Sequence, residues 1–305
     1  MNKKYYGIIP PIITPVDERE NVDEEGFRKL IDHCMDGGLH GIFVAGSNGE
    51  CMALTQKERD NAIRIAVEQC GDRVPVMAGV MDTSTRRVIE NIKKLEQLGG
   101  TCAVVTSIFY ARHTSQDETV RHFEQISRET NVDVMIYNIP MFTNLKLTVN
   151  AMQEIAKFDR VVGIEDSSGD FAAFQQLMTH FAGKDFAMLQ GTTAYAMVSM
   201  LLGSDGFVPS IAPVFPELFV EAFEAGRSGD IGLAMKYDVL LRETSKILGM
   251  TKNATSANKF AISTLGYTDK RVIAPQDSIL PEEEKKIIAK IAEVHEMHAA
   301  LKASL

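Results

Sequence analysis

The sequence predicts an α/β fold, a (β/α)₈ TIM barrel with a C-terminal helical extension. Short β-branched runs alternate with amphipathic helical patterns from the N-terminus to about residue 210, as in parallel βαβ units. Eight such units close a barrel. After the eighth run, helix follows helix without a further strand pattern. We therefore expect a barrel over residues 1–213 and helices packed on it over residues 214–305.

Each candidate strand is a short apolar run that ends near polar or glycine-containing segments. Helices with recognisable N-termini lie between the strands, because Thr55 with Glu58 and Ser115 with Glu118 both fit the capping box. The segment around Pro213 and Pro216 is too short and apolar for a linker, which favours an extension over an independent domain. The candidate strands are residues 6–13, 41–45, 74–80, 103–106, 133–137, 161–164, 186–189 and 206–208, and the C-terminal helices are residues 217–225, 230–248, 255–265 and 281–301.

Composition excludes several classes of protein. Of 305 residues, 32 are basic and 41 acidic, and the formal charge of −9 argues against a nucleic-acid partner. No apolar run approaches the roughly 18 residues of a membrane span, and residues 1–6 are not followed by the apolar region of a signal peptide. We expect a cytoplasmic protein without membrane contact. The four scattered cysteines are expected to be small buried hydrophobic residues.

Active sites of such barrels lie at the C-terminal ends of the strands, so the residues after each strand are the candidates. The second strand is followed by G-S-N-G-E, residues 46–50. Two glycines permit a tight loop that exposes backbone amides beside Ser47 and Asn48, which suits a carboxylate. An ordinary strand-to-helix turn also recruits these residue types, and both interpretations remain open.

Three further strand ends carry candidate groups. The fifth ends in Y-N-I-P, where Tyr137 is either a proton shuttle or a tyrosine that packs at the core edge. The sixth ends in G-I-E-D-S-S-G-D, which places Glu165 at the barrel mouth. The eighth ends in G-F-V-P, an apolar end with a rigid exit, where Val208 is a candidate substrate contact.

Together these segments resemble, in order and spacing, the family that contains dihydrodipicolinate synthase, N-acetylneuraminate lyase and 4-hydroxy-2-oxoglutarate aldolase. The opening G-I-I-P-P-I-I-T-P is similar to the first strand of that family, and the likeness covers roughly residues 7–265. The resemblance implies that Ser47 and Asn48 bind the carboxylate of a 2-oxo acid and that Tyr137 passes protons. It also implies a homo-oligomer, a dimer or a homotetramer of paired dimers.

Two positions depart from that family. Its sixth strand reads G-I-K, and the lysine forms an imine with the 2-oxo carbon, whereas this chain has Glu165, which cannot form one. The synthases carry an arginine for the carboxylate of the aldehyde five residues after the tyrosine, where this chain has Phe142. The family's tyrosine from a neighbouring subunit falls on Ala111 when counted from Ser115, and on Tyr110 after a shift of one residue.

Three lysines elsewhere in the chain are candidates to replace the missing one. Lys146, Lys252 and Lys259 all lie in helical or loop contexts that predict solvated amines, which are poor nucleophiles at neutral pH. Glu165 and Asp166 are weak candidates for a metal site, because adjacent residues of a strand point to opposite faces of the sheet. We expect neither metal nor cofactor.

Two functions are consistent with these residues. The first is a lyase of aldolase or dehydratase type that acts on a small 2-oxo acid or sugar acid, with a desolvated Glu165 as general acid or base and Tyr137 beside it. We do not expect a role in lysine biosynthesis, because Glu165 and Phe142 stand where the synthases have a lysine and an arginine. The second is an inactive family member that binds a 2-oxo or sugar acid as a sensor or partner protein, since binding groups can survive the loss of a nucleophile.

Overall fold

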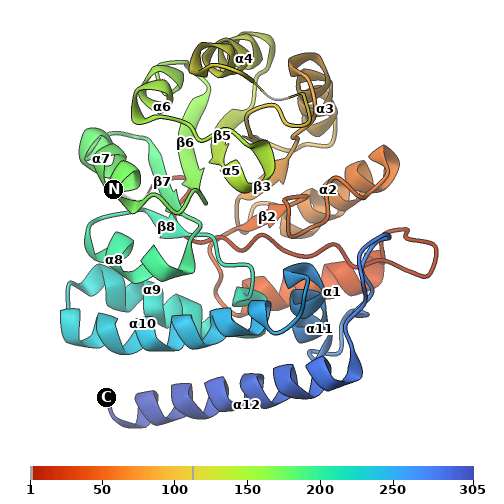
Figure 1. The fold of residues 1–305 in the computed structure, drawn as a ribbon, viewed down its shortest axis with the longest axis vertical. Coiled ribbons are helices and arrows are strands. Elements are labelled where there is room, and N and C mark those ends of the chain that lie inside the picture. Colours follow the sequence, from red (N-terminus) through yellow and green to blue (C-terminus); the bar gives the residue numbers. More distant parts are fainter. Residues whose placement is uncertain (1–2, 112) are drawn as a thin grey trace.

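The computed structural model describes residues 3–111 and 113–305 (Figure 1). Its eight parallel strands confirm the predicted fold class, and each overlaps its predicted run. They follow the order β1-β8-β7-β6-β5-β4-β3-β2, and a parallel bridge between Pro11 and Phe43 joins the chain after β1 to β2 and closes the ring. The strands are β1 (Gly7–Ile8), β2 (Ile42–Val44), β3 (Val76–Gly79), β4 (Cys102–Val105), β5 (Asp133–Asn138), β6 (Val161–Asp166), β7 (Ala187–Gln190) and β8 (Gly206–Phe207).

Helices cover the outer face of the sheet (Figure 1), and side chains of the strands fill the barrel interior on its inner face. Every residue of β2, β4 and β7 is buried, as expected for parallel strands packed between side chains of the interior and the helix layer. The helices are α1 (Glu24–Asp36), α2 (Gln56–Cys70), α3 (Thr85–Gln97), α4 (Gln116–Glu129), α5 (Pro140–Thr143), α6 (Val149–Ile155), α7 (Phe171–Phe181), α8 (Ala196–Leu201), α9 (Pro216–Ser228), α10 (Ile231–Lys246), α11 (Ala254–Ser263) and α12 (Pro281–Ala303).

The C-terminal helices form where the sequence predicts them. Helix α9 contacts β1 and α8, α10 packs on α9, and the long helix α12 packs against α10 and α11 (Figure 1). The chain between β8 and α9, residues 208–215, contains one 3₁₀ turn, Ala212–Val214, and no exposed residue. The division of the chain at residues 213 and 214 into barrel and extension stays a prediction.

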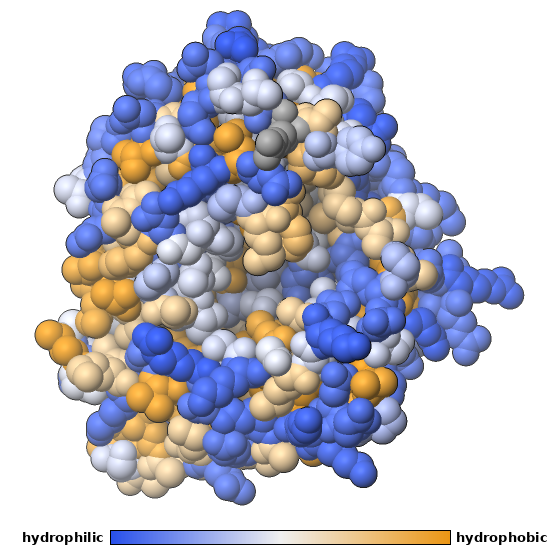
Figure 2. All heavy atoms as spheres, in the orientation of Figure 1, coloured by the Kyte–Doolittle hydropathy of each residue, from blue (hydrophilic) through white to orange (hydrophobic). Residues whose placement is uncertain are grey.

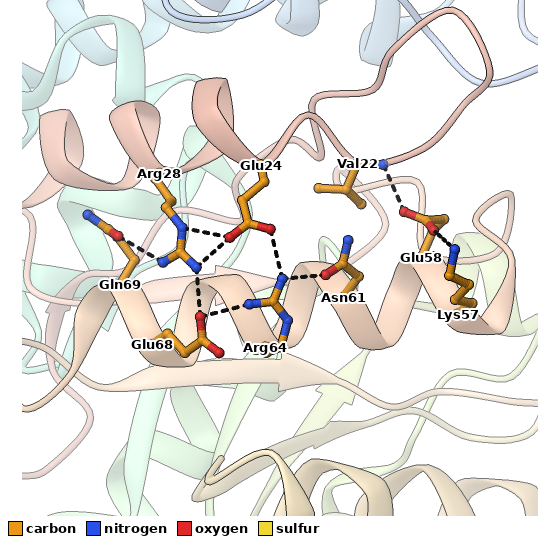
Figure 3. Close-up of polar contacts among 9 residues, drawn as sticks. All are labelled: Val22, Glu24, Arg28, Lys57, Glu58, Asn61, Arg64, Glu68 and Gln69. Atoms are coloured by element: carbon orange, nitrogen blue, oxygen red, sulfur yellow. Dashed lines mark hydrogen bonds and ion pairs between the residues drawn. The ribbon is translucent and has the colours of Figure 1, made fainter.

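One of the two predicted capping boxes is wrong. Ser115 and Glu118 cap α4 reciprocally, as expected. Thr55 accepts from the backbone N–H of Glu58, but the Glu58 carboxylate does not return to Thr55 and instead accepts from the N–H of Val22 at 2.8 Å. Glu58 therefore fastens the chain before α1 to the start of α2, a contact that Figure 3 shows.

A network of ion pairs on the outer faces of α1 and α2 also joins these two helices. Arg28 of α1 contacts Glu24 on its own helix and Glu68 on α2, both at 2.6 Å (Figure 3). Arg64 of α2 reaches back to Glu24 and to Glu68, each at 2.8 Å. Because these groups are partly exposed, the network adds little stability per pair, but it fixes the pairing of the helices.

All four cysteines are free and buried, which confirms the prediction.

No helix within residues 3–111 and 113–305 combines the length and the apolar character needed to cross a bilayer.

Candidate active site

The centre of the candidate site is a pair of side chains on neighbouring strands. Tyr137 of β5 and Glu165 of β6 occupy the same register of the sheet. Residues in register on adjacent parallel strands point to the same face, so the phenol and the carboxyl lie side by side. Tyr137 is only 7% exposed and Glu165 only 2%. The edge of the Tyr137 ring also packs on Phe43, with the ring centres 5.7 Å apart.

The carboxyl of Glu165 is buried with one partner. Ser167 donates its hydroxyl to Oε1 at 2.8 Å, while Oε2 has no hydrogen-bond partner among the described residues. Burial raises the pKa of Glu165 well above its ordinary value of 4.5; the negative charge of Asp166 adds to this, and the Ser167 hydrogen bond opposes it. Burial therefore favours the protonated form of Glu165, and Oε2, the oxygen without a partner among the described residues, is free to carry the acidic hydrogen.

A glycine makes room for this carboxyl. Gly191 follows β7, next to β6 in the sheet. A Cβ at Gly191 would come within 2.0 Å of both Glu165 Oε1 and Ser167 Oγ. Any larger residue would displace the carboxyl, so Gly191 is a residue of the site. Polar groups at strand ends do not reveal it in the sequence.

Tyr137 connects Glu165 to the loop after β2. Its hydroxyl lies 3.5 Å from the Ser47 hydroxyl, a long contact in which either group can donate. Burial raises the pKa of Tyr137, and a negative charge on Glu165 would raise it further. The phenol is therefore neutral. Ser47 and Tyr137 are thus in hydroxyl contact, and Tyr137 lies in register with Glu165 on the neighbouring strand.

The side chain of Asn48 is engaged within the protein. Its Nδ2 donates to the carbonyl of Pro11, and its Oδ1 accepts from Asn258 Nδ2 at 2.9 Å. These bonds tie the loop to the first strand region and to α11. Of the two side chains predicted to cradle a carboxylate, only Ser47 lines a cavity, and its hydroxyl has a single long contact, with Tyr137.

The last residue of the G-S-N-G-E loop is part of a buried ion pair. Glu50, which has a positive φ of 55°, contacts the amine of Lys259, and both side chains are fully buried. Glu50 Oε1 also accepts from the N–H of Ile273 at 2.8 Å, and Lys259 donates to the carbonyl of Arg271 at 2.7 Å. The loop after β2 is thus fastened to the C-terminal segments.

The expectation of a solvated Lys259 is therefore wrong. Burial lowers the pKa of Lys259, whereas the Glu50 charge raises it. Its amine is committed to Glu50 and to a backbone carbonyl, so it is no free nucleophile. Lys252 is exposed, and Lys146 is half exposed and pairs with Asp170 at the surface, as predicted.

Beside Ser47 lies a cavity of about 620 Å³. The space-filling view shows a hollow near the middle of this face (Figure 2). Phe142, one of the candidate substrate contacts, lines the cavity, but Asn48, Tyr137, Glu165 and Val208 do not, and Val208 is 5% exposed. The roles of these residues stay predictions. The lining residues are Ser47, Glu50, Cys51, Met52, Ala53, Met81, Thr106, Phe109, Ile139, Phe142, Thr143, Asn253, Thr255 and Gln276.

Several lining residues were not foreseen from the sequence. Met81 and Phe109 come shortly after β3 and β4, so inspection of every strand end would have found them. Thr255 and Gln276 come from the C-terminal part, where no strand end marks them. Tyr110 is 96% exposed with a φ of 66° and does not line the cavity of its own chain, so a tyrosine role at a neighbouring site stays a prediction.

Asp166 points away from Glu165, as its place on the strand requires. Its Oδ1 accepts from the N–H of Ser168 at 2.7 Å and from Asn138 Nδ2 at 3.3 Å. Within the described part of the chain, no group of three His, Cys, Asp or Glu side chains is placed to hold a metal ion.

Comparison with known proteins gives a consistent result. A model of the dihydrodipicolinate synthetase family matches residues 4–294. A 4-hydroxy-tetrahydrodipicolinate synthase of Phenylobacterium zucineum is 30% identical over 273 residues, which cover 89% of this chain and 91% of that protein. A similar relative from Halobacterium salinarum, an uncharacterised DapA-like lyase, is 31% identical over 225 residues, 74% of this chain and 73% of that protein.

Solved structures agree over nearly the whole chain. Dihydrodipicolinate synthase from Bacteroides thetaiotaomicron superposes with a TM-score of 0.90 at 29% identity, covering 96% of this chain and all of that one. A prophage protein of the dihydrodipicolinic acid synthase family from E. coli K12, solved in complex with pyruvate, gives a TM-score of 0.90 at 27% identity, with 95% and 99% covered.

Proposed function

Because the chain belongs to the dihydrodipicolinate synthetase family, we propose that it is a lyase that acts on a small 2-oxo acid or sugar acid without forming an imine at residue 165. The observation that carries this proposal is the buried carboxyl of Glu165, which lies in register with Tyr137 and whose pKa is raised by burial. The likeness to a protein solved with pyruvate supports a 2-oxo acid as the substrate class.

In this proposal the neutral carboxyl replaces the imine as the electron sink. For a 4-hydroxy-2-oxo acid, the proton of the 4-hydroxyl leaves through Tyr137 and Ser47, and the bond between C3 and C4 breaks to give an aldehyde. Its electron pair forms an enolate, and Glu165 donates its proton to the 2-oxo oxygen. Water at the end of the relay takes the 4-hydroxyl proton and later protonates C3, while the enol hydroxyl returns its proton to the Glu165 carboxylate. Pyruvate forms and Glu165 is neutral again, so atoms and charges balance.

We further propose that the chain is not a dihydrodipicolinate synthase. Glu165 excludes the imine, and Phe142 offers no cation to the carboxylate of an aldehyde. Loss of such a contact in a dry site lowers specificity by about 10² to 10³. Purified protein supplied with pyruvate and aspartate semialdehyde is expected to give no condensation product, and steady synthase turnover would contradict this part of the proposal.

A second function is favoured by one observation. Tyr137 and Glu165 lie outside the cavity lining and are almost fully buried, whereas Ser47 is accessible. A protein with that arrangement can bind the carboxylate of a 2-oxo or sugar acid and catalyse nothing. The alternative is therefore a sensor or partner protein that uses the loop after β2 for binding alone.

Exchange of the pyruvate methyl protons in D₂O separates the two functions, because it reports enol formation without any second substrate. Proton NMR should show exchange catalysed by the wild-type protein. Glu165→Gln keeps the shape of the side chain but cannot donate the acidic proton, and it should slow exchange at least about 100-fold. Pyruvate binding without exchange in the wild type, or equal exchange in Glu165→Gln, would favour the binding function.

A further inference from the structure

We propose that the cavity beside Ser47 receives an uncharged, largely apolar part of the substrate, such as an aryl or alkyl aldehyde, and excludes a second carboxylate or a phosphate. This inference rests on the proposed function, because it assigns the 2-oxo acid part of the substrate to Ser47, Tyr137 and Glu165 and only the remaining part to the cavity. It narrows the substrate class within that function.

One wall of the cavity is apolar. Met81 and Phe109 come from the ends of β3 and β4, and Ile139 and Phe142 come from the turn and the short helix after β5. Phe142 is 54% exposed, although aromatic rings are usually buried in a folded chain. A partly exposed ring at a concave site offers a stacking surface to an apolar ligand.

The lining carries no free positive charge. Among the described residues, it contains no Lys, Arg or His, and its ionisable groups are Glu50 and Cys51. Glu50 is paired with Lys259, which is fully buried behind it and does not reach the cavity. Burial raises the pKa of Cys51 to about 12, so the thiol is neutral. An anion in this cavity would lose hydration without gaining a partner.

A nearby arginine does not change this conclusion. The guanidinium of Arg59 is 5% exposed and lies behind Met81, where it donates to the Met81 carbonyl at 3.1 Å and to Gln56 Oε1 at 2.6 Å. Arg59 is absent from the lining. Its charge is held by backbone and side-chain oxygens outside the cavity.

The C-terminal part of the chain contributes neutral polar groups to the lining. Asn253 and Gln276 bond to one another through their amides, and Asn253 also accepts from the N–H of Thr255 at 2.9 Å. These pairings occupy part of the donors and acceptors of both amides, so fewer of them remain for a ligand. A polyhydroxylated sugar chain would place several hydroxyls against the apolar wall, so the cavity favours a 2-oxo acid with an apolar partner over a sugar acid.

A matched ligand pair tests the preference without requiring turnover. Benzamide and benzoate have nearly the same shape and differ in charge, and excess pyruvate occupies any site for a 2-oxo carboxylate. Titration calorimetry should show that the wild-type protein binds benzamide at least about 10-fold more tightly than benzoate. Equal affinities, tighter binding of benzoate, or no binding of either ligand would overturn the inference.

Two variants show where the preference resides. Phe142→Arg places a cation in the lining and should reverse the preference toward benzoate. Met141→Arg adds the same charge one residue away, at a side chain that is 76% exposed and outside the lining, and should leave the preference unchanged. Equal responses of the two variants would mean that long-range charge, and not the cavity wall, decides between the ligands.

The ligand-binding experiment and the methyl-exchange experiment can fail separately. The benzamide preference together with undiminished methyl exchange in Glu165→Gln would remove the proposed mechanism and leave the cavity assignment standing. Exchange that depends on Glu165 without any benzamide preference would do the reverse.

Discussion

Tyr137 and Glu165 occupy the same register on the adjacent parallel strands β5 and β6, and both are almost fully buried at the C-terminal ends of those strands. Burial raises the pKa of both groups and so favours their neutral forms, and a negative charge on Glu165 would raise the pKa of Tyr137 further. Neighbouring groups of this kind hold protons ready for transfer at a pH where isolated carboxylates are ionised.

The first prediction is that Glu165 makes stability fall as pH rises. Its pKa in the folded protein lies well above 4.5, so above pH 4.5 the unfolded chain releases this proton first and the folded state binds more protons. The free energy of unfolding should therefore fall by about 1.4 kcal/mol per pH unit relative to Glu165→Gln, until the pH passes the folded pKa. Urea unfolding of both proteins between pH 4 and pH 9 measures the difference, and parallel curves would contradict a raised pKa.

The second prediction concerns Gly191, whose missing side chain leaves space for Glu165. Gly191→Ala would place a Cβ 2.0 Å from Glu165 Oε1, and overpacking of this kind costs about 1–3 kcal/mol. Methyl exchange should also fall, because the carboxyl must move. Gly249→Ala is the matched control, since nothing lies within 4 Å of its Cβ position, and it should change neither stability nor exchange appreciably. A harmless Gly191→Ala would mean that the carboxyl is mobile.

The third prediction is that Glu165→Lys forms an imine with pyruvate. The sixth strand directs residue 165 into the same buried position, where desolvation would lower the pKa of the new amine and make it nucleophilic. Mass spectrometry after borohydride reduction should place a pyruvyl adduct on residue 165. A variant that is folded by circular dichroism yet gains no adduct with any small 2-oxo acid would show that Ser47 and Tyr137 no longer form a 2-oxo acid site.

The fourth prediction separates a buried ion pair from an exposed one. Lys259→Met leaves the buried Glu50 carboxylate without its cation and should cost about 3–5 kcal/mol of unfolding free energy. Lys146→Met breaks the half-exposed pair with Asp170 and should cost less than about 1 kcal/mol. Denaturant titration compares them. Similar small losses in both variants would mean that the Glu50 contact does not hold the loop after β2.

Much of the fold could be predicted because its signals are local. Each of the eight strands is a short apolar run between helical patterns, and the Ser115 cap lies within four residues of its partner Glu118. The place of Glu165 at the barrel mouth follows from the same periodicity, since the end of the sixth strand fixes it. These features depend on neighbours in the sequence, which the sequence displays.

The remaining features depend on contacts between distant parts of the chain. Asn48 bonds to Asn258, 210 residues away, and Glu50 to the N–H of Ile273, 223 residues away. The burial of Lys259 follows from these contacts and not from its own helix, which by itself resembles a solvated one. Glu58 bonds to Val22 for the same reason, and no local pattern predicts that it abandons its capping box.

The central claim is that this barrel handles a 2-oxo acid without an imine, and reductive trapping tests it most directly. The wild-type protein is incubated with pyruvate under the conditions of methyl exchange, sodium borohydride is added, and the intact mass is measured. The account predicts an unchanged mass while exchange proceeds, because Glu165 cannot form an imine and Lys259 is bound to Glu50. A reduced pyruvyl group on Lys259, or on any other lysine that exchange requires, would contradict it.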